Sequence, residues 1–302
     1  MNHGVPYVRC MAPPDVSEKP PWLRTKVVMA SGMGVRGALD SCGLRTVCDS
    51  SRCPNLGECW GKGHATFIIL GERCTRSCQF CAVPSGTPSE TDPDEVGNLA
   101  EAVRRLRLRH VVVTSVTRDD LPDGGASIFA EVVREVRWNN PGTTVELLIP
   151  DLQGNREALE TILEVAPDVL GHNIETVRSM QWIRDRRASY ERSLGVLKMT
   201  KDISPGTLTK SSLMLGLGET REELVQAMKD LRSVGVDLLT LGQYLPPKGS
   251  NLQVRRYVPP QEFEELHDLA MGMGFKGARA GPLVRSSYDA FDLMIEAGAR
   301  RC

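Results

Sequence analysis

The sequence has no apolar run long enough to cross a bilayer. A membrane-spanning helix needs about 18 consecutive apolar residues, and the prominent run at residues 65–70 is far shorter. Residues 1–14 show neither the basic start and apolar stretch of a secretory signal nor the Arg- and Ser-rich pattern of a transit peptide. We therefore expect a cytoplasmic protein with no membrane partner.

The sequence also has almost no net charge. Its 37 Lys and Arg residues against 38 Asp and Glu give a formal net charge of −1. Such a balance creates no long-range attraction for nucleic acid, so none is expected as a partner. The contents of hydrophobic residues, 41%, and charged residues, 25%, are ordinary for a globular protein with a hydrophobic core. The 302 residues suffice for one large domain or two small ones.

Disulfides are not expected, because a chain without a secretory signal meets a reducing environment. The sequence nevertheless has nine cysteines, and six of them fall between Cys48 and Cys81. Such bunching favours metal ligation over scattered core thiols. The other three, Cys10, Cys42 and Cys302, match no motif.

From residue 65 onward, short apolar runs alternate with stretches of helical periodicity. Each run is bounded by Gly, Pro or polar turn residues, which is typical of buried parallel strands. The expected strands are residues 65–70, 111–115, 144–149, 169–173, 212–217 and 238–243.

Helices are expected between these strands. Residues 96–103 repeat apolar side chains at helical spacing, and Asp92 followed by Pro93 indicates the start of that helix. A capping box formed by Thr220 and Glu223 predicts the start of another. Further helices are expected near residues 126–138, 155–165, 188–200 and 260–273.

Six strand–helix units predict an α/β fold with a parallel sheet and right-handed crossovers. Six are too few for an eight-unit barrel, so we expect a partial (β/α)6 barrel; a doubly wound open sheet stays possible from the pattern. Residues 1–62 would form an N-terminal extension, 63–275 the barrel and 276–302 a C-terminal segment. Reactive groups should lie in the loops that follow the carboxyl ends of the strands.

Three cysteines follow the first expected strand. Cys74, Cys78 and Cys81 form a Cys-x3-Cys-x2-Cys motif, and three such thiolates can bind three irons of a 4Fe–4S cluster while leaving the fourth iron open. The alternative is a zinc site, but zinc usually takes Cys-x2-Cys pairs from two places, and Cys74 would then be surplus. With Phe80 before the last cysteine, the motif resembles that of the radical S-adenosylmethionine enzymes, whose cluster cleaves S-adenosylmethionine to a 5′-deoxyadenosyl radical.

A second motif lies upstream. Cys48, Cys53 and Cys59 form Cys-x4-Cys-x5-Cys, which is neither a standard zinc nor a ferredoxin spacing, although a zinc knuckle remains the alternative. With both motifs in this order, the chain resembles the lipoyl synthase family, and the resemblance extends over about residues 20–290. It is carried further by residues 112–126, 172–177, 211–220, 241–244 and 281–288.

The resemblance implies two 4Fe–4S clusters and S-adenosylmethionine as cofactors. The cluster that cleaves S-adenosylmethionine would be held by Cys74, Cys78 and Cys81, and an auxiliary cluster by Cys48, Cys53, Cys59 and Ser287. Spacing alone gives no reason to choose Ser287; its alkoxide is a harder ligand than thiolate, so its bond to iron should break more easily.

The resemblance also places four residues near S-adenosylmethionine. Thr114 or Ser115 would lie near the amino group of its methionine part, although both could serve only strand-end hydrogen bonding. Asn173 and Glu175 would lie near the ribose or the substrate.

For activity, the resemblance implies insertion of two sulfur atoms, at carbons 6 and 8 of a protein-bound octanoyl-lysine, with the auxiliary cluster as sulfur donor. The implied partners are lipoyl carrier domains of 2-oxoacid dehydrogenase complexes, the H protein of glycine cleavage, and an electron donor such as ferredoxin or flavodoxin. Two alternatives stay open. One is a radical enzyme whose second cluster relays electrons or anchors substrate, and the other is a non-enzymatic metal-binding interaction module.

Overall fold

The computed structural model describes most of the chain from residue 64 onward and shorter stretches before it. The described residues are 18–24, 36–37, 39, 42–50, 53, 55–61, 64–247 and 249–298. Cys10 and Cys302 lie outside them, and Cys42 is buried in the hydrophobic core. Within the described residues, no helix combines the length and apolar character that a membrane crossing requires.

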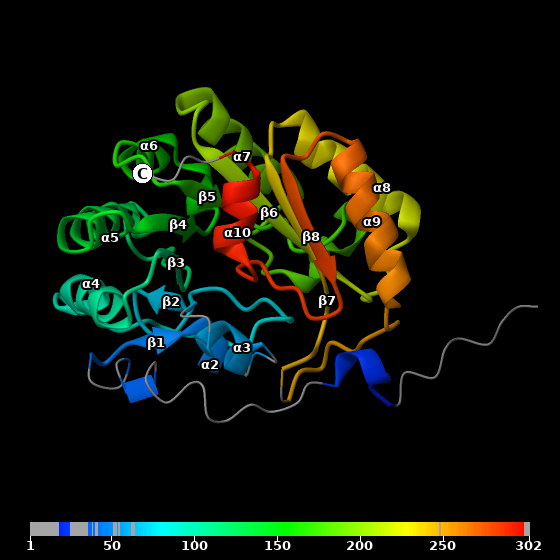
Figure 1. Cartoon of the computed structure of the whole chain (residues 1–302), viewed down its shortest axis with the longest axis horizontal. Coiled ribbons are helices and arrows are strands. Elements are labelled where there is room, and N and C mark those ends of the chain that lie inside the picture. Colours follow the sequence, from blue (N-terminus) through cyan, green and yellow to red (C-terminus); the bar gives the residue numbers. More distant parts are fainter. Residues whose placement is uncertain are drawn as a thin grey trace, which may run out of the picture.

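The molecule is built on an eight-stranded sheet whose strands follow the order of the chain (Figure 1). The first pair, β1 and β2, is antiparallel, and each later strand is parallel to the one before it. A doubly wound sheet reverses its strand order at a switch point, whereas this sheet has no reversal. The partial barrel is therefore confirmed. The strands are β1 Arg45–Thr46, β2 Thr66–Ile69, β3 His110–Ser115, β4 Thr144–Leu148, β5 Val169–Gly171, β6 Leu208–Leu215, β7 Leu238–Gln243 and β8 Gly277–Gly281.

All six expected strands are present, as β2 to β7, and the structure adds β8 beyond them. The sequence of β8, Gly-Ala-Arg-Ala-Gly, contains no apolar run, so the pattern gave no sign of it. The C-terminal segment expected at 276–302 thus begins with a strand that pairs with β7. Strand β6 also begins four residues earlier than expected, because the polar residues Thr209, Lys210 and Ser211 are buried within it.

The long helices lie in an arc around the outside of the curved sheet (Figure 1). They are α4 Glu95–Leu106, α5 Ala126–Asn139, α6 Arg156–Leu163, α7 Tyr190–Ile203, α8 Arg221–Ser233 and α9 Pro260–Gly272. The shorter helices are η1 Pro21–Leu23, α2 Val47–Ser50, α3 Leu56–Gly61, η2 Leu152–Gly154, η3 Arg178–Ile183 and α10 Ala290–Glu296.

Two helix starts test the sequence signals directly. Helix α8 begins with the predicted capping box: the hydroxyl of Thr220 accepts from the backbone N–H of Glu223, and the carboxylate of Glu223 accepts from the backbone N–H of Thr220. Helix α4 begins at Glu95, two residues later than Asp92-Pro93 predicted. The carboxylate of Glu95 accepts a hydrogen bond from the backbone N–H of Leu70 at 2.8 Å, which ties the helix start to the end of β2.

The sheet has an apolar outer face and a polar inner face. Side chains alternate between the faces of a strand, and Phe67, Val113 and Leu147 pack in one buried core with the residues of the outer helices. The neighbouring positions on the same strands, such as Thr66 and Glu146, point the other way. Polar groups for chemistry are therefore available inside the curve of the sheet.

A buried ion pair joins two strands across this inner face. Nζ of Lys210 in β6 lies 2.8 Å from Oε1 of Glu146 in β4, and both side chains are at most 3% exposed. Since β5 lies between these strands, the pair spans it. Burial alone would raise the pKa of Glu146, but the charge of Lys210 and the nearby His110, whose Nε2 lies 3.7 Å from the carboxylate, overcome burial and hold the pKa below its ordinary value.

Removing Lys210 should destabilise the fold, because a buried carboxylate without its partner costs about 3–5 kcal/mol. We expect Lys210→Met to lower the free energy of unfolding in urea at pH 7 by that amount, and the double variant Lys210→Met/Glu146→Met to recover most of it. The wild-type pair contributes stability above the ordinary carboxylate pKa and loses it as the pH falls through the lowered pKa of Glu146. A single variant as stable as the wild type would contradict this account.

Candidate iron–sulfur sites

The loop with Cys74, Cys78 and Cys81 follows the carboxyl end of β2. Its two ends are joined, because the backbone N–H of Cys74 donates to the carbonyl of Pro84, and that of Gly86 donates to the carbonyl of Cys74, each at 2.9 Å. The three cysteines therefore lie on one closed turn, as their spacing predicted.

Each of the three sulfur atoms accepts a backbone N–H. The donors are Thr117 to Cys74 at 3.3 Å, Asp185 to Cys78 at 3.2 Å and Val83 to Cys81 at 3.5 Å. Such bonds favour the thiolate form, which is the form that binds iron. Two of the donors lie far along the chain, so the fold as a whole shapes this loop.

Burial has the opposite effect to these hydrogen bonds, because it favours the neutral thiol over the thiolate. It raises the pKa of the Cys78 thiol, and the nearby charge of Glu175 adds to the increase, although the backbone of Asp185 and the charge of Arg184 oppose it. Burial and the charge of Cys53 likewise raise the pKa of Cys48. A bound metal deprotonates coordinating thiols outright. The buried thiols therefore suit metal ligation and lack the activation that a nucleophilic cysteine needs.

Arg76 anchors the cysteine loop to the barrel. Its buried guanidinium bonds to the carboxylates of Asp119 and Asp151 at 2.6 to 2.9 Å, with two hydrogen bonds to each. These two paired contacts fix the plane of the Arg76 guanidinium. Because Arg76 lies between Cys74 and Cys78 in the sequence, they also restrain the loop that carries both cysteines. Sequence reasoning missed Arg76 and Asp151, since the only available signal was a single arginine inside a metal-binding motif.

The hydroxyl groups expected near S-adenosylmethionine differ in their bonding. Oγ1 of Thr114 donates to the carbonyl of Leu148 at 2.7 Å, which is the strand-end bonding that the sequence left open as an alternative. Oγ of Ser115 is buried without a hydrogen-bond partner among the residues that the structure describes. An unpaired buried hydroxyl is costly, so Ser115 is available to a ligand.

Asn173 and Glu175 follow the carboxyl end of β5. Glu175 has a left-handed backbone, with φ +65°, and its peptide groups bond to the backbones of Ser212 and Met214 in β6. Burial raises the pKa of Glu175, although the charge of Arg184 and a hydrogen bond with Asn173 oppose it. The strained backbone thus places a carboxylate near the sulfur of Cys78.

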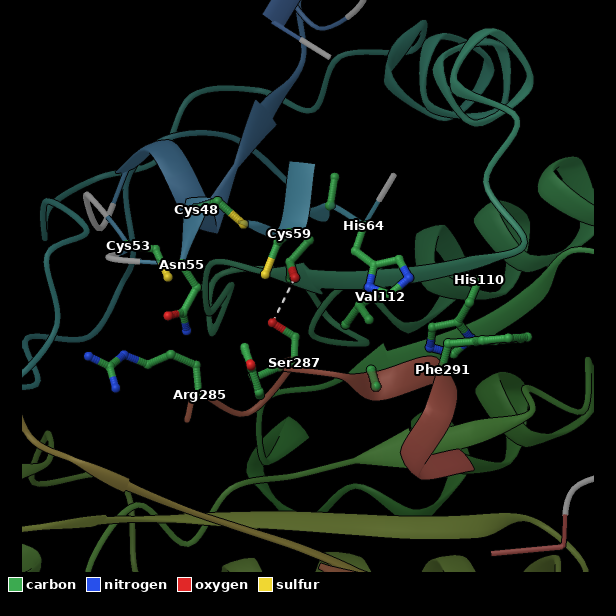
Figure 2. A pocket seen from close by; sticks show the side chains of 14 residues that line it. Cys48, Cys53, Asn55, Cys59, His64, His110, Val112, Arg285, Ser287 and Phe291 are labelled. Carbon is green, nitrogen blue, oxygen red and sulfur yellow. Dashed lines mark hydrogen bonds between the residues drawn. The ribbon is translucent and has the colours of Figure 1, made fainter. Parts of the chain in front are cut away.

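A second group of cysteines lines a pocket on the inner side of β2 and β3. Figure 2 shows Cys48, Cys53 and Cys59 of the N-terminal part on one side of this pocket and Ser287 of the C-terminal segment on the other. The hydroxyl of Thr66, the first residue of β2, donates to Oγ of Ser287 at 2.7 Å. The structure therefore brings together all four residues expected at the auxiliary cluster.

Further contacts hold the C-terminal segment over this pocket. Nδ2 of Asn55 donates to the carbonyl of Leu283 at 2.6 Å, and the Tyr288 hydroxyl donates to Glu58 at 3.2 Å. A Cβ at Gly242 of β7 would lie 2.1 Å from the carbonyl oxygen of Val284, so only glycine allows the segment to pass so close.

Sequence reasoning gave no role at the pocket to Asn55, Thr66 or Arg285, which also line it. Asn55 and Arg285 lie inside quoted motifs, and Thr66 lies in an expected strand, but spacing gave none of them a role. Burial lowers the pKa of the Arg285 guanidinium, while the charge of Cys53 opposes that change. A cation therefore lies beside one of the candidate ligands.

The donor sets fit clusters. In the described part of the chain, no three Cys, His, Asp or Glu side chains converge closely enough to share a single metal ion. A 4Fe–4S cube offers a separate iron to each thiolate. Three cysteines that do not converge on a single point are therefore compatible with a cluster. The hydroxyl of Ser287 lies in the same pocket as Cys48, Cys53 and Cys59 as a fourth donor group, an oxygen.

Solved structures share this fold at low sequence identity. The chain resembles methylornithine synthase with a TM-score of 0.51 and 14% identity, over 88% of this chain and 79% of that one. It resembles the FeFe-hydrogenase maturase HydG from Carboxydothermus hydrogenoformans with a TM-score of 0.59 and 13% identity, over 79% of this chain and 58% of that one. At such identities the likeness shows the fold alone.

Sequence relatives are far more similar. Residues 68–231 match the radical SAM superfamily. The chain is 52% identical to the lipoyl synthase of Pyrobaculum calidifontis, over 92% of this chain and 97% of the relative. It is 50% identical to that of Symbiobacterium thermophilum, over 98% of this chain and 93% of the relative. Both cysteine motifs and the partial barrel agree with this relationship, and the chain belongs to the lipoyl synthase family of the radical SAM superfamily.

Proposed function

We propose that the chain inserts sulfur at carbons 6 and 8 of an octanoyl chain carried on a protein lysine, and that an auxiliary cluster is the sulfur donor. The observation that carries the proposal is the pocket that gathers Cys48, Cys53, Cys59 and Ser287, apart from the loop that follows β2. A second metal site with its own oxygen ligand suits a group that is consumed, because a hard ligand is the weaker partner for such iron.

The residues divide between the two sites. Cys74, Cys78 and Cys81 would hold the cluster that binds S-adenosylmethionine, and Cys48, Cys53, Cys59 and Ser287 would hold the auxiliary cluster. When bound, these groups supply a radical that removes unactivated hydrogen atoms and the sulfide that replaces them.

The protein's own residues would position the reactants and exclude water from them. The N–H groups on the three sulfurs stabilise thiolate ligands, and Arg76 fixes the loop that carries them. Ser115 has a free buried hydroxyl, and the Thr114 oxygen still has a lone pair, so either can accept from the cofactor's amino group. Glu175 and Asn173 would contact the ribose or the substrate. A buried, ordered pocket of this kind holds reactants in place for a step that water would quench.

The hydrogen bond to Ser287 favours its role as a ligand. Because Thr66 donates to Oγ of Ser287, it stabilises negative charge on that oxygen. The same contact would keep Ser287 in place when its bond to iron breaks. Thr66 would thus position Ser287 as a ligand of the auxiliary cluster.

The proposal extends to domains and partners. Residues 1–62 would carry the auxiliary motif, 63–275 the barrel, and 276–302 would close on the auxiliary pocket, which the bonds from Asn55 and Tyr288 support. The carriers would be lipoyl domains of 2-oxoacid dehydrogenase complexes and the glycine cleavage H protein. The electron donor would be a ferredoxin or flavodoxin.

Cysteine variants should separate the two sites. The wild type should hold about eight irons per chain after anaerobic reconstitution, and Cys78→Ala and Cys53→Ala about four each. Cys78→Ala should abolish 5′-deoxyadenosine formation. Cys53→Ala should keep it but form no carbon–sulfur bond, as mass spectrometry of an octanoyl-lysine peptide would show. If Cys78→Ala made 5′-deoxyadenosine at the native rate, the assignment of the first site would be wrong.

Ser287→Ala tests the oxygen ligand. We expect it to leave cleavage of S-adenosylmethionine intact but to reduce lipoyl formation at least tenfold, because the auxiliary cluster loses one ligand and its hydrogen-bonded anchor. Ser286→Ala, a change of the same size on the same loop outside the pocket, is the matched control and should behave as the wild type. Native lipoyl yield from Ser287→Ala would show that the serine is a bystander.

A further inference from the structure

A buried chain of hydrogen bonds links the end of β5, helix α7 and the segment that follows η3. It links His172, at the end of β5, to Ser193 in α7 and then to Arg184, which follows η3. The three residues are 3%, 0% and 8% exposed. None of them belongs to a cysteine motif, and the proposed function assigns them no role.

The donor and acceptor of each hydrogen bond follow from the carbonyl group of Ile149 at the start of the chain of bonds. Nδ1 of His172 lies 2.9 Å from the carbonyl of Ile149, which can only accept, so Nδ1 carries the proton. Burial and the charge of Arg184 lower the pKa of His172 to about 4, which keeps the ring neutral at neutral pH. Nε2 of His172 must then accept from the hydroxyl of Ser193 at 2.9 Å.

The same logic orients Arg184. With its own hydrogen given to His172, Oγ of Ser193 accepts from Nη1 of Arg184 at 2.9 Å. The second hydrogen of Nη1 goes to Oε1 of Gln181 at 3.0 Å. Both hydrogens of Nη1 are therefore used, and the guanidinium is held from one side.

The other two nitrogens of the Arg184 guanidinium, Nε and Nη2, are available to a ligand. Nε and Nη2 of Arg184 donate to no residue in the described part of the chain. The backbone N–H of the next residue, Asp185, donates to the sulfur of Cys78 at 3.2 Å, so Arg184 lies beside the cysteine loop. Arg184 as a whole is only 8% exposed, so its two unpaired nitrogens can donate to a ligand that enters the site.

We propose that His172 and Ser193 are positioning residues that hold Arg184 for the carboxylate of S-adenosylmethionine. Of the two molecules that the proposed function brings to this pocket, only the cofactor carries a carboxylate, since the octanoyl amide is neutral. A guanidinium held in one plane binds a carboxylate with two parallel hydrogen bonds. The inference rests on the proposed function.

Ser193→Ala in the reconstituted enzyme tests the role of the chain. It removes both the acceptor for Arg184 and the donor for His172, so we expect the Kd for S-adenosylmethionine, measured by equilibrium dialysis, to rise about tenfold. The KM for S-adenosylmethionine should rise similarly while kcat changes less, and the iron content should stay native. Thr200→Val is the matched control, because Thr200 is an equally buried residue of α7 whose hydroxyl donates to the carbonyl of Val196; its Kd should stay native.

A second pair of variants separates positioning from folding. His172→Gln can still accept from Ser193 through its side-chain oxygen, whereas His172→Phe cannot. We expect His172→Phe to weaken binding about tenfold and His172→Gln to restore most of the affinity. Unchanged Kd values in both Ser193→Ala and His172→Phe would overturn the inference alone. Failure of the wild-type enzyme to bind S-adenosylmethionine would overturn the proposed function as well.

Discussion

The hydrogen bond from Thr66 to Ser287 joins two parts of the chain that are 221 residues apart. Thr66 begins the first parallel strand, and Ser287 follows the last one, so this contact closes the open side of the partial barrel over the cysteines of the N-terminal part. Asn55, Glu58 and Gly242 serve the same end by holding the C-terminal segment close. The auxiliary pocket exists only while these distant segments are held together.

The two cysteine sites lie toward opposite ends of one short strand. Strand β2 runs from Thr66 beside the auxiliary pocket to Ile69, just before the loop of Cys74, and its length is about 10 Å at the usual rise per residue. An extended acyl chain inside the curve of the sheet can thus approach both sites. The buried pair of Arg76 with Asp151 holds the cysteine loop against the barrel. The fold supplies a fixed distance and orientation, which is what a reaction at an unactivated carbon requires.

Much of this arrangement could be predicted from the sequence, and the remainder has physical reasons for being hidden. The six strands were visible because each contains a run of apolar residues that pack in the hydrophobic core, and the cysteines because their spacing restricts the metal they can bind. Strand β8 was not, since glycine and alanine leave no apolar pattern. The role of Ser287 was inferred only from the family resemblance. The contacts of Arg76 with Asp151 and of His172 with Ser193 join single residues far apart in the sequence, which no motif spacing could reveal.

The central claim is that the pocket of Cys48, Cys53, Cys59 and Ser287 holds the sulfur that enters the product. The most direct measurement is isotopic. The enzyme would be reconstituted with heavy-isotope sulfide, given an octanoyl-lysine peptide and S-adenosylmethionine under anaerobic conditions, and its product weighed by mass spectrometry. The account predicts that both sulfur atoms of the lipoyl group carry the label, with about one product per chain. Unlabelled lipoyl product from fully labelled enzyme would contradict it.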